Sequence, residues 1–152
     1  MTREFETLAD FKAAVGEELG TSEWVEVTQE KINLFADATG DHQWIHVDPE
    51  RAAKGPFGKP IAHGYLTLSL LPVLTEQIYS VKSVVMGVNY GANKVRFPHP
   101  VPVDSRVRAT ATLKETQDIA IGTQAVLTVV VEIDGVEKPA CIAEVVYVLS
   151  EG

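Results

Sequence analysis

Residues 62–78 read AHGYLTLSLLPVLTEQI, and this segment is apolar on nearly every side until Glu76. A helix of that composition is typical of a protein core rather than of a surface. Pro72 lies inside the segment and removes one backbone hydrogen bond, so we expect a kink or break between Leu68 and Pro72. The segment therefore predicts a buried central helix around which the rest of the chain is arranged.

The chain after residue 80 has the composition of β-strands. Asp134-Gly135 predicts a turn between the last two strands, and residues 106–113 alternate as a half-buried strand does. Five segments are rich in Val, Ile, Thr and Tyr: residues 81–90, 92–97, 106–115, 124–133 and 140–149. Consecutive strands after a mainly helical half indicate an antiparallel sheet in an α+β domain. The simplest arrangement wraps that sheet around the apolar helix.

The segment that precedes the central helix is predicted to contain further helices and one short strand. Apolar residues at helical spacing predict a helix over residues 8–19 that stops at Gly20, and residues 24–27 indicate a strand. Thr28 is a good N-cap for a second helix, which Gly40 would end. Asp48-Pro49 marks the start of a third, short helix. Residues 41–47 are therefore expected to form a loop just past a helix end.

Length, composition and charge favour one ordinary globular domain over residues 1–152. Hydrophobic residues make up 45% of the chain and charged residues 22%, and the formal net charge of −8 argues against nucleic-acid binding. No signal peptide or bilayer-length apolar run is evident, so we expect a cytoplasmic protein that does not bind membranes. Cys141 is the only cysteine, and its apolar neighbours predict a small buried side chain rather than a reactive thiol.

Asp41 and His46 are the residues best suited to chemistry. A carboxylate and an imidazole that converge on one small molecule can move protons to and from it near neutral pH. Gly64 opens the central helix, where unpaired backbone N–H groups stabilise negative charge. Taken singly, Asp41 could be a turn residue and His46 a partly buried structural histidine. Together with Gly64 they indicate an acid–base enzyme that acts on a carbonyl compound.

Four segments resemble the MaoC-like, (R)-specific enoyl-CoA hydratases, the hydratase 2 family. The run FADATGDHQWIHVD at residues 35–48 resembles the hydratase 2 motif, and IAHGYL at residues 61–66 resembles the segment that follows it. Weaker similarity covers NYGANKVRF at residues 89–97 and the turn over residues 98–107. The resemblance spans residues 24–148 and is greatest to small single-domain members of actinobacterial type.

The resemblance implies a hot-dog fold, a curved antiparallel sheet wrapped around one long helix. It also implies reversible addition of water to a trans-2-enoyl-CoA, giving the (3R)-hydroxyacyl-CoA of fatty-acid metabolism. In this assignment His46 is the base, Asp41 the proton donor and the Gly64 N–H the oxyanion donor. No cofactor and no metal are expected, CoA enters as part of the substrate, and the chain is expected to form a homodimer.

The resemblance also suggests substrate contacts and shows where this chain departs from the family. Gln43, Trp44 and Tyr65 are the candidate substrate-binding residues. Many relatives carry Asn and Pro where this chain has Gln43 and Trp44, and some carry a water-orienting serine where it has Pro72. The CoA phosphates could meet a basic group of four residues: Lys94, Arg96, Arg106 and Arg108.

Two other functions and several other residue roles remain open. A hot-dog thioesterase would cleave the acyl–sulfur bond, and a non-catalytic acyl-binding subunit of a heterodimeric dehydratase would do no chemistry. His42 and His46 have the spacing of a helical metal pair, but the expected loop and the lack of an evident third ligand argue against metal binding. His63 is interpreted as a structural residue that joins two loops, and His99 as an exposed residue.

Overall fold

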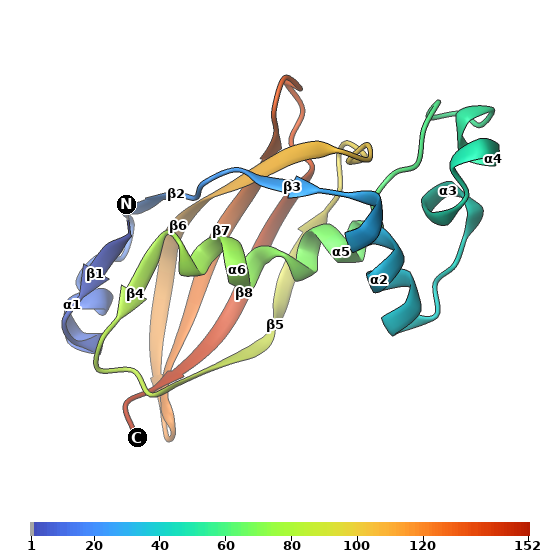
Figure 1. The fold of residues 1–152 in the computed structure, drawn as a ribbon. Coiled ribbons are helices and arrows are strands. Elements are labelled where there is room, and N and C mark those ends of the chain that lie inside the picture. Colours follow the sequence, from blue (N-terminus) through green and yellow to red (C-terminus); the bar gives the residue numbers. More distant parts are fainter. Residues whose placement is uncertain (1) are drawn as a thin grey trace.

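A curved antiparallel sheet lies against a central helical segment in the computed structural model of the chain, which describes residues 2–152 (Figure 1). The six-stranded sheet has the order β2-β6-β7-β8-β5, and β3 also pairs with β6. Its strands are β2 (Glu18–Thr21), β3 (Val25–Val27), β5 (Met86–Arg96), β6 (Ser105–Ile119), β7 (Gly122–Ile133) and β8 (Cys141–Ser150). This is the hot-dog arrangement that the resemblance implied.

The central helix is broken into two short helices, α5 (Gly64–Ser69) and α6 (Leu71–Glu76). The break falls at Leu70, two residues before Pro72, because proline cannot donate the backbone hydrogen bond that would continue α5. The predicted break is therefore confirmed. The prediction of burial on nearly every side is wrong, since Tyr65 is 70% exposed and Val73 is 43% exposed.

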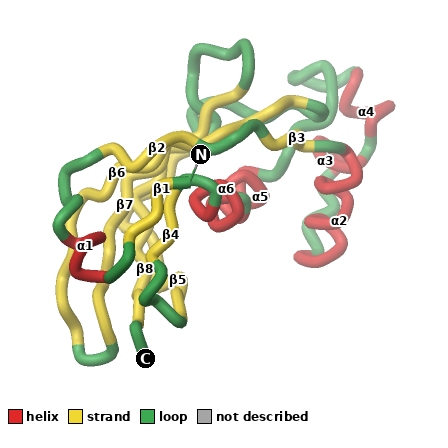
Figure 2. Tube along the Cα trace, turned by 60° about the vertical axis from the view of Figure 1, so that its left-hand side comes forward, coloured by secondary structure: helices red, strands yellow, loops and turns green. Residues whose placement is uncertain are grey.

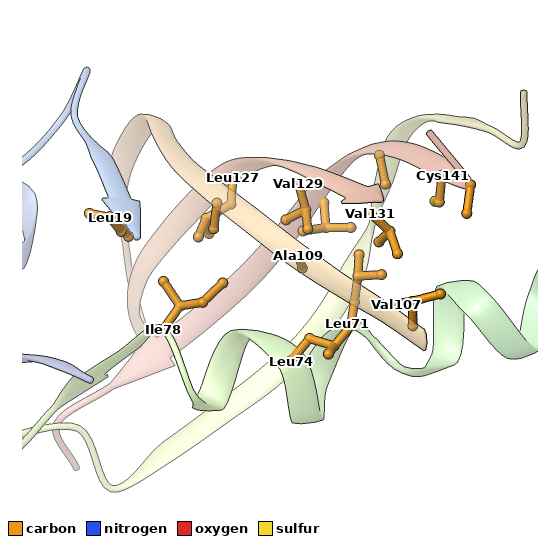
Figure 3. Packing of buried hydrophobic residues seen from close by; sticks show 14 of the residues in the cluster. Leu19, Leu71, Leu74, Ile78, Val107, Ala109, Leu127, Val129, Val131 and Cys141 are labelled. Carbon is orange, nitrogen blue, oxygen red and sulfur yellow. The ribbon is translucent and has the colours of Figure 1, made fainter. Parts of the chain in front are cut away.

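The core lies between α6 and the concave face of the sheet (Figure 3). Leu71 and Leu74 are 1% and 0% exposed, and the alternating residues of β6 and β7 that face them are also buried. These sheet residues include Val107, Ala109, Ala111, Leu113, Leu127, Val129 and Val131. The β6 alternation predicted from sequence is therefore confirmed, and it positions α6 firmly on the sheet.

The N-terminal segment differs from the predicted helix over residues 8–19. Only α1 (Leu8–Lys12) is helical, and Leu19 is buried in β2 instead. The chain turns at Gly16, whose φ is 92° and whose N–H donates to the Leu113 carbonyl at 2.7 Å. Backbone pairing with β6 thus overrides the helical spacing of the apolar residues. A short parallel pair, β1 (Arg3–Phe5) and β4 (Tyr79–Val81), lies beside α1.

The strands predicted at residues 81–90 and 92–97 form one strand, β5. The backbone passes Gly91 with shifts in register against β8 rather than with a turn. The predicted turn at Asp134-Gly135 is confirmed, with Gly135 at φ 79°, although the connection from β7 to β8 runs over residues 134–140. The remaining strands lie within a few residues of their predicted bounds, apart from β6, which extends to Ile119.

Three helices stand beyond the end of the sheet, next to the start of α5 (Figure 2). They are α2 (Gln29–Thr39), α3 (Trp44–Val47) and α4 (Pro49–Ala53). The side chain of Thr28 caps α2 and the side chain of Asp48 caps α4, as the sequence predicted. This helical extension brings the candidate catalytic residues to the N-terminus of α5.

Candidate active site

Asp41 lies directly after the C-terminus of α2, where the chain leaves the helix. Gly40 ends α2 in the left-handed conformation (φ 84°), and its N–H donates to the Ala36 carbonyl at 2.8 Å. Glycine adopts this conformation without steric cost, so the helix stops before Asp41, as predicted. The exposed Asp41 carboxylate accepts a hydrogen bond from the backbone N–H of Gln43 at 3.3 Å. This contact holds Asp41 at the start of the segment that carries His46.

His46 lies on α3, a single helical turn within the segment that was expected to be a loop. Its ring is 6% exposed, and Nδ1 lies 2.6 Å from the carbonyl oxygen of Ile61. A carbonyl oxygen can only accept, so Nδ1 carries the hydrogen and donates. In the neutral ring Nε2 is then an unprotonated acceptor, and no partner for it is found within residues 2–152. His46 therefore presents one free basic nitrogen.

Burial is the main cause that lowers the pKa of His46 below its ordinary value. The nearby His63 ring acts in the same direction, whereas the Ile61 carbonyl and the charge of Asp41 oppose it. Burial disfavours the charged imidazolium because the protein interior solvates charge less well than water does. His46 is thus uncharged at neutral pH, the form that can accept a proton.

His63 joins Asp41 and His46 from the segment that precedes α5. Its Nε2 lies 2.9 Å from the Asp41 carbonyl oxygen, and its ring stacks on that of His46 with centroids 3.9 Å apart. The potential ligand atoms of Asp41, His46 and His63 all lie within 4.8 Å of one another. The structure therefore brings together the expected pair and adds a third group.

These three residue types could bind a metal ion, but their geometry does not favour one. The lone pair of an imidazole nitrogen lies in the plane of the ring, and zinc binds it at about 2.0–2.1 Å. The rings of His46 and His63 are stacked with an interplanar angle of 23°, so their lone pairs lie in nearly parallel planes. Such lone pairs do not converge on one ion. His42, the other half of the spacing-based metal pair, faces Asp37 instead, at 2.9 Å.

Gly64 is the first residue of α5, next to the stacked histidines. As the first helical residue it has no intrahelical partner for its N–H, and none is found elsewhere in the part of the chain that the structure describes. A Cβ at this position would lie 3.0 Å from Cδ2 of Phe97. The absence of a side chain thus lets Phe97 pack directly on the backbone that carries the free N–H.

An apolar hollow of about 280 Å³ opens beside His46 and Gly64. Phe57, Phe97 and His99 are among the residues that line it. The volume is at the small end for ligand sites, so it suits one part of a larger substrate. None of these three residues was a site candidate from sequence, and the expectation of an exposed His99 is wrong, since His99 is half-buried. Local sequence carries no signal for residues brought together only by the fold.

The candidate substrate-binding residues Gln43, Trp44 and Tyr65 do not line this hollow. Gln43 is exposed, and Tyr65 meets Phe97 edge to face with centroids 6.2 Å apart. Trp44 packs under the guanidinium of Arg51, which lies 4.4 Å from the ring centroid. Trp44 thus stabilises the turn around α4, where many relatives were expected to use proline.

The basic group and the cysteine occupy other parts of the molecule. Arg106 pairs with Asp134 and Arg108 pairs with Glu132, and both guanidinium groups lie over the Trp24 ring. Two of the four candidate phosphate ligands are thus already compensated by acidic side chains. Burial raises the pKa of Cys141 to about 11, which leaves it an unreactive core thiol as expected. Within residues 2–152, no helix is long and apolar enough to cross a membrane.

Comparison with known proteins gives one family match that covers most of the chain. The model of the MaoC like domain matches residues 10–136. A 3-hydroxyacyl-thioester dehydratase Z from Mycobacterium tuberculosis is 63% identical over 143 residues, which cover 93% of this chain and 95% of the relative. Similarity at this level over nearly the full length of both proteins includes the segment that carries the candidate site.

Two solved structures share the fold. A monoamine oxidase regulatory protein from Archaeoglobus fulgius superposes with a TM-score of 0.76 at 27% identity, covering 99% of this chain and 98% of the other. An (R)-hydratase from A. caviae involved in PHA biosynthesis superposes with a TM-score of 0.73 at 26% identity, covering 89% of this chain and 96% of the other. These similarities extend over the sheet, the central helix and the helical extension.

Proposed function

The chain belongs to the MaoC-like domain family, and we propose that it is an (R)-specific enoyl-CoA hydratase and 3-hydroxyacyl-CoA dehydratase. It adds water reversibly to the double bond of a trans-2-enoyl thioester. The (R)-hydratase and the 3-hydroxyacyl-thioester dehydratase to which it is similar support this reaction. The observation that carries the proposal is that His46 and Gly64, with its free N–H, line one apolar hollow, while the Asp41 carboxylate lies within 4.8 Å of a ring nitrogen of His46.

In the hydration direction the water binds between Asp41 and His46. The neutral His46 takes a proton from the water at Nε2 while the oxygen attacks the β-carbon of the enoyl group. This proton passes from His46 to Asp41, which delivers it to the α-carbon, so both groups return to their starting state. Each transfer contributes about 10²- to 10⁴-fold to the rate.

Negative charge develops on the thioester oxygen as the new carbon–oxygen bond forms. The Gly64 N–H donates to this oxygen at the start of α5, where unpaired N–H groups favour negative charge. The hollow beside Gly64 holds the thioester and the adjoining part of the CoA arm. His46 lines this hollow and the Asp41 carboxylate lies within 4.8 Å of a ring nitrogen of His46, so the pair adds the hydroxyl and the proton to the same face of the double bond.

We also infer that the chain forms a homodimer through β5. This strand is an edge of the sheet, pairs with β8 alone among the described residues, and exposes Val88 and Tyr90 by 44% and 70%. A long, exposed and apolar edge strand is prone to pair with another chain. An apolar groove between β5 and the central helix, lined in part by Leu68, Leu71 and Tyr147, lies beside this edge. A second copy would cover the groove and provide room for the acyl chain.

Light scattering on the purified protein tests the homodimer. We expect a mass near twice the 16.5 kDa of one chain, and a concentration-dependent shift toward one chain in Val88→Lys. A wild-type protein that stays at the mass of one chain at all concentrations would contradict the inference. Arg106→Lys on the far part of the sheet serves as the control and should leave the mass unchanged.

One assay separates hydration from the other two functions. Loss of the enoyl-thioester absorbance with crotonyl-CoA is followed in parallel with release of free thiol. We expect absorbance loss without thiol release. Thiol release alone would mean a thioesterase, and neither signal with intact acyl-CoA binding would mean a non-catalytic subunit.

A further inference from the structure

His63 occupies a position that the proposed reaction does not yet use. It directly precedes Gly64, is 2% exposed, and lies between two aromatic rings. The ring of His46 lies 3.9 Å away and that of Phe35, on α2, lies 4.8 Å away, centroid to centroid. One buried side chain at the start of α5 thus contacts both α2 and α3.

The hydrogen bond of His63 defines which ring nitrogen carries its hydrogen. Nε2 lies 2.9 Å from the Asp41 carbonyl oxygen, which can only accept, so Nε2 carries the hydrogen. In the neutral ring Nδ1 is then an acceptor. It is buried and has no partner among residues 2–152. Buried polar atoms without a partner are uncommon and destabilising, so a purely structural role would be better served by another side chain.

The imidazole combines two properties that the site needs at one position. Its N–H fixes the backbone of Asp41, and its flat face fixes the plane of the His46 ring. We propose that His63 is a positioning residue that aligns Asp41 and His46 with each other and with the N–H of Gly64. This inference rests on the proposed hydratase function, in which those three groups act on one substrate.

The stack also affects how His46 accepts its proton. Asp41 and His63 are the titratable groups that face His46 from the segments after α2 and before α5, and His99 lines the same hollow. From α4, the Asp48 carboxylate is turned toward the backbone N–H of Arg51. The His63 ring that faces His46 is one of the causes that lower the pKa of His46, so it favours the uncharged form that accepts a proton.

Two substitutions separate the two properties of His63. His63→Phe keeps a flat ring against His46 and loses the N–H to Asp41, whereas His63→Gln keeps a donor and loses the ring. We expect each to reduce kcat by about 10- to 100-fold with KM changed by less than about threefold, because misplacement of reacting groups lowers turnover more than binding. His42→Gln, at the exposed histidine that pairs with Asp37, is the matched control and should retain wild-type kcat.

The acid limb of the pH profile gives a readout that a merely structural role would not move. His63 is one of the causes that lower the pKa of His46, so His63→Gln should shift the acid limb of kcat/KM to higher pH. His63→Phe likewise removes a titratable neighbour and should shift it in the same direction. A wild-type kcat and acid limb in both variants, measured per mole of folded protein, would overturn the proposal.

Nuclear magnetic resonance of the ring nitrogens tests the inference without using activity. In the wild type we expect His63 as the Nε2–H form, and His46 should titrate at lower pH than in His63→Gln. A wild-type protein without hydratase activity that shows both signals would refute the proposed function and keep the coupling of the two rings. An unshifted His46 titration together with wild-type kcat in His63→Gln would refute the inference and keep the function.

Discussion

The two halves of the central helix have a similar apolar sequence and different environments. In α6, Leu71 and Leu74 are buried in the core, and the Thr75 hydroxyl donates back to the Leu71 carbonyl at 2.8 Å. At the start of α5, the N–H of Gly64 is free and Nδ1 of His63 is buried without a partner among the described residues. The Thr75 hydroxyl is thus satisfied in the half that packs on the sheet, whereas these two polar groups at the start of the other half are left available next to the site.

The largest expected effect on turnover comes from Asp41 and His46, which lie next to the start of α5. His46→Gln and Asp41→Asn should each lower kcat by about 10²- to 10⁴-fold, because each removes one proton transfer. The thermal midpoint should change little, since neither residue belongs to the core beneath the sheet. Steady-state assays and thermal melts on the same preparations measure both. Near wild-type turnover in either variant would contradict the catalytic assignment.

In α6 we expect the reverse, a loss of stability without a loss of turnover. Leu74→Ala removes a side chain that is 0% exposed and should destabilise the protein by about 2–5 kcal/mol. Denaturant unfolding measures the loss of stability, and kcat per mole of folded protein should remain close to that of the wild type. A large loss of kcat in fully folded Leu74→Ala would show that the two halves do not have separate tasks. Val73→Ala, on the exposed side of α6, is the matched control.

Gly64→Ala tests the start of α5 directly. The new Cβ would lie 3.0 Å from Cδ2 of Phe97, so the ring must move into the hollow or the helix start must shift. We expect kcat to fall by up to about 10²-fold as the N–H loses its alignment. The double variant Gly64→Ala with Phe97→Leu should recover part of the activity, because the smaller side chain makes room. No recovery would mean that the backbone, rather than the ring, is displaced.

The smallest expected effect is a difference between the wild type and His46→Gln in how the free energy of unfolding depends on pH. Folding lowers the pKa of His46, so the folded protein binds fewer protons than the unfolded chain near the ordinary histidine pKa. The resulting stabilisation is present above that pKa and is lost as the pH falls below it. Denaturant unfolding should show the wild type losing stability more steeply than His46→Gln below about pH 6.5. Equal slopes would contradict the neutral, buried state of His46.

The parts of the fold and site that depend on local sequence could be predicted. Thr28, Gly40 and the Asp48-Pro49 pair mark helix ends through contacts within a few residues, and the structure has them where the sequence indicated. The break near Pro72 follows in the same way from a missing N–H. Asp41 and His46 were placed next to each other for the same reason, because only one short segment separates them.

Features that depend on distant contacts could not be predicted from the same signals. Leu19 has helical spacing from Leu8, but it belongs to β2 because that segment pairs with β6, which comes much later in the chain. The stack of His63 on His46 and the presence of Phe97 beside Gly64 likewise require the folded arrangement. Resemblance to a family supplied the site, whereas the neighbours that surround it came only from the three-dimensional structure.

Hydration in D₂O tests the central claim most directly. Asp41 and His46 lie next to each other, with His46 lining the hollow, so we expect a (3R)-hydroxyacyl-CoA with a single deuterium at C2, added to the same face as the hydroxyl. Chiral separation of the product and the proton coupling between C2 and C3 measure both centres. A (3S) product, or deuterium on the opposite face, would contradict water addition by this pair.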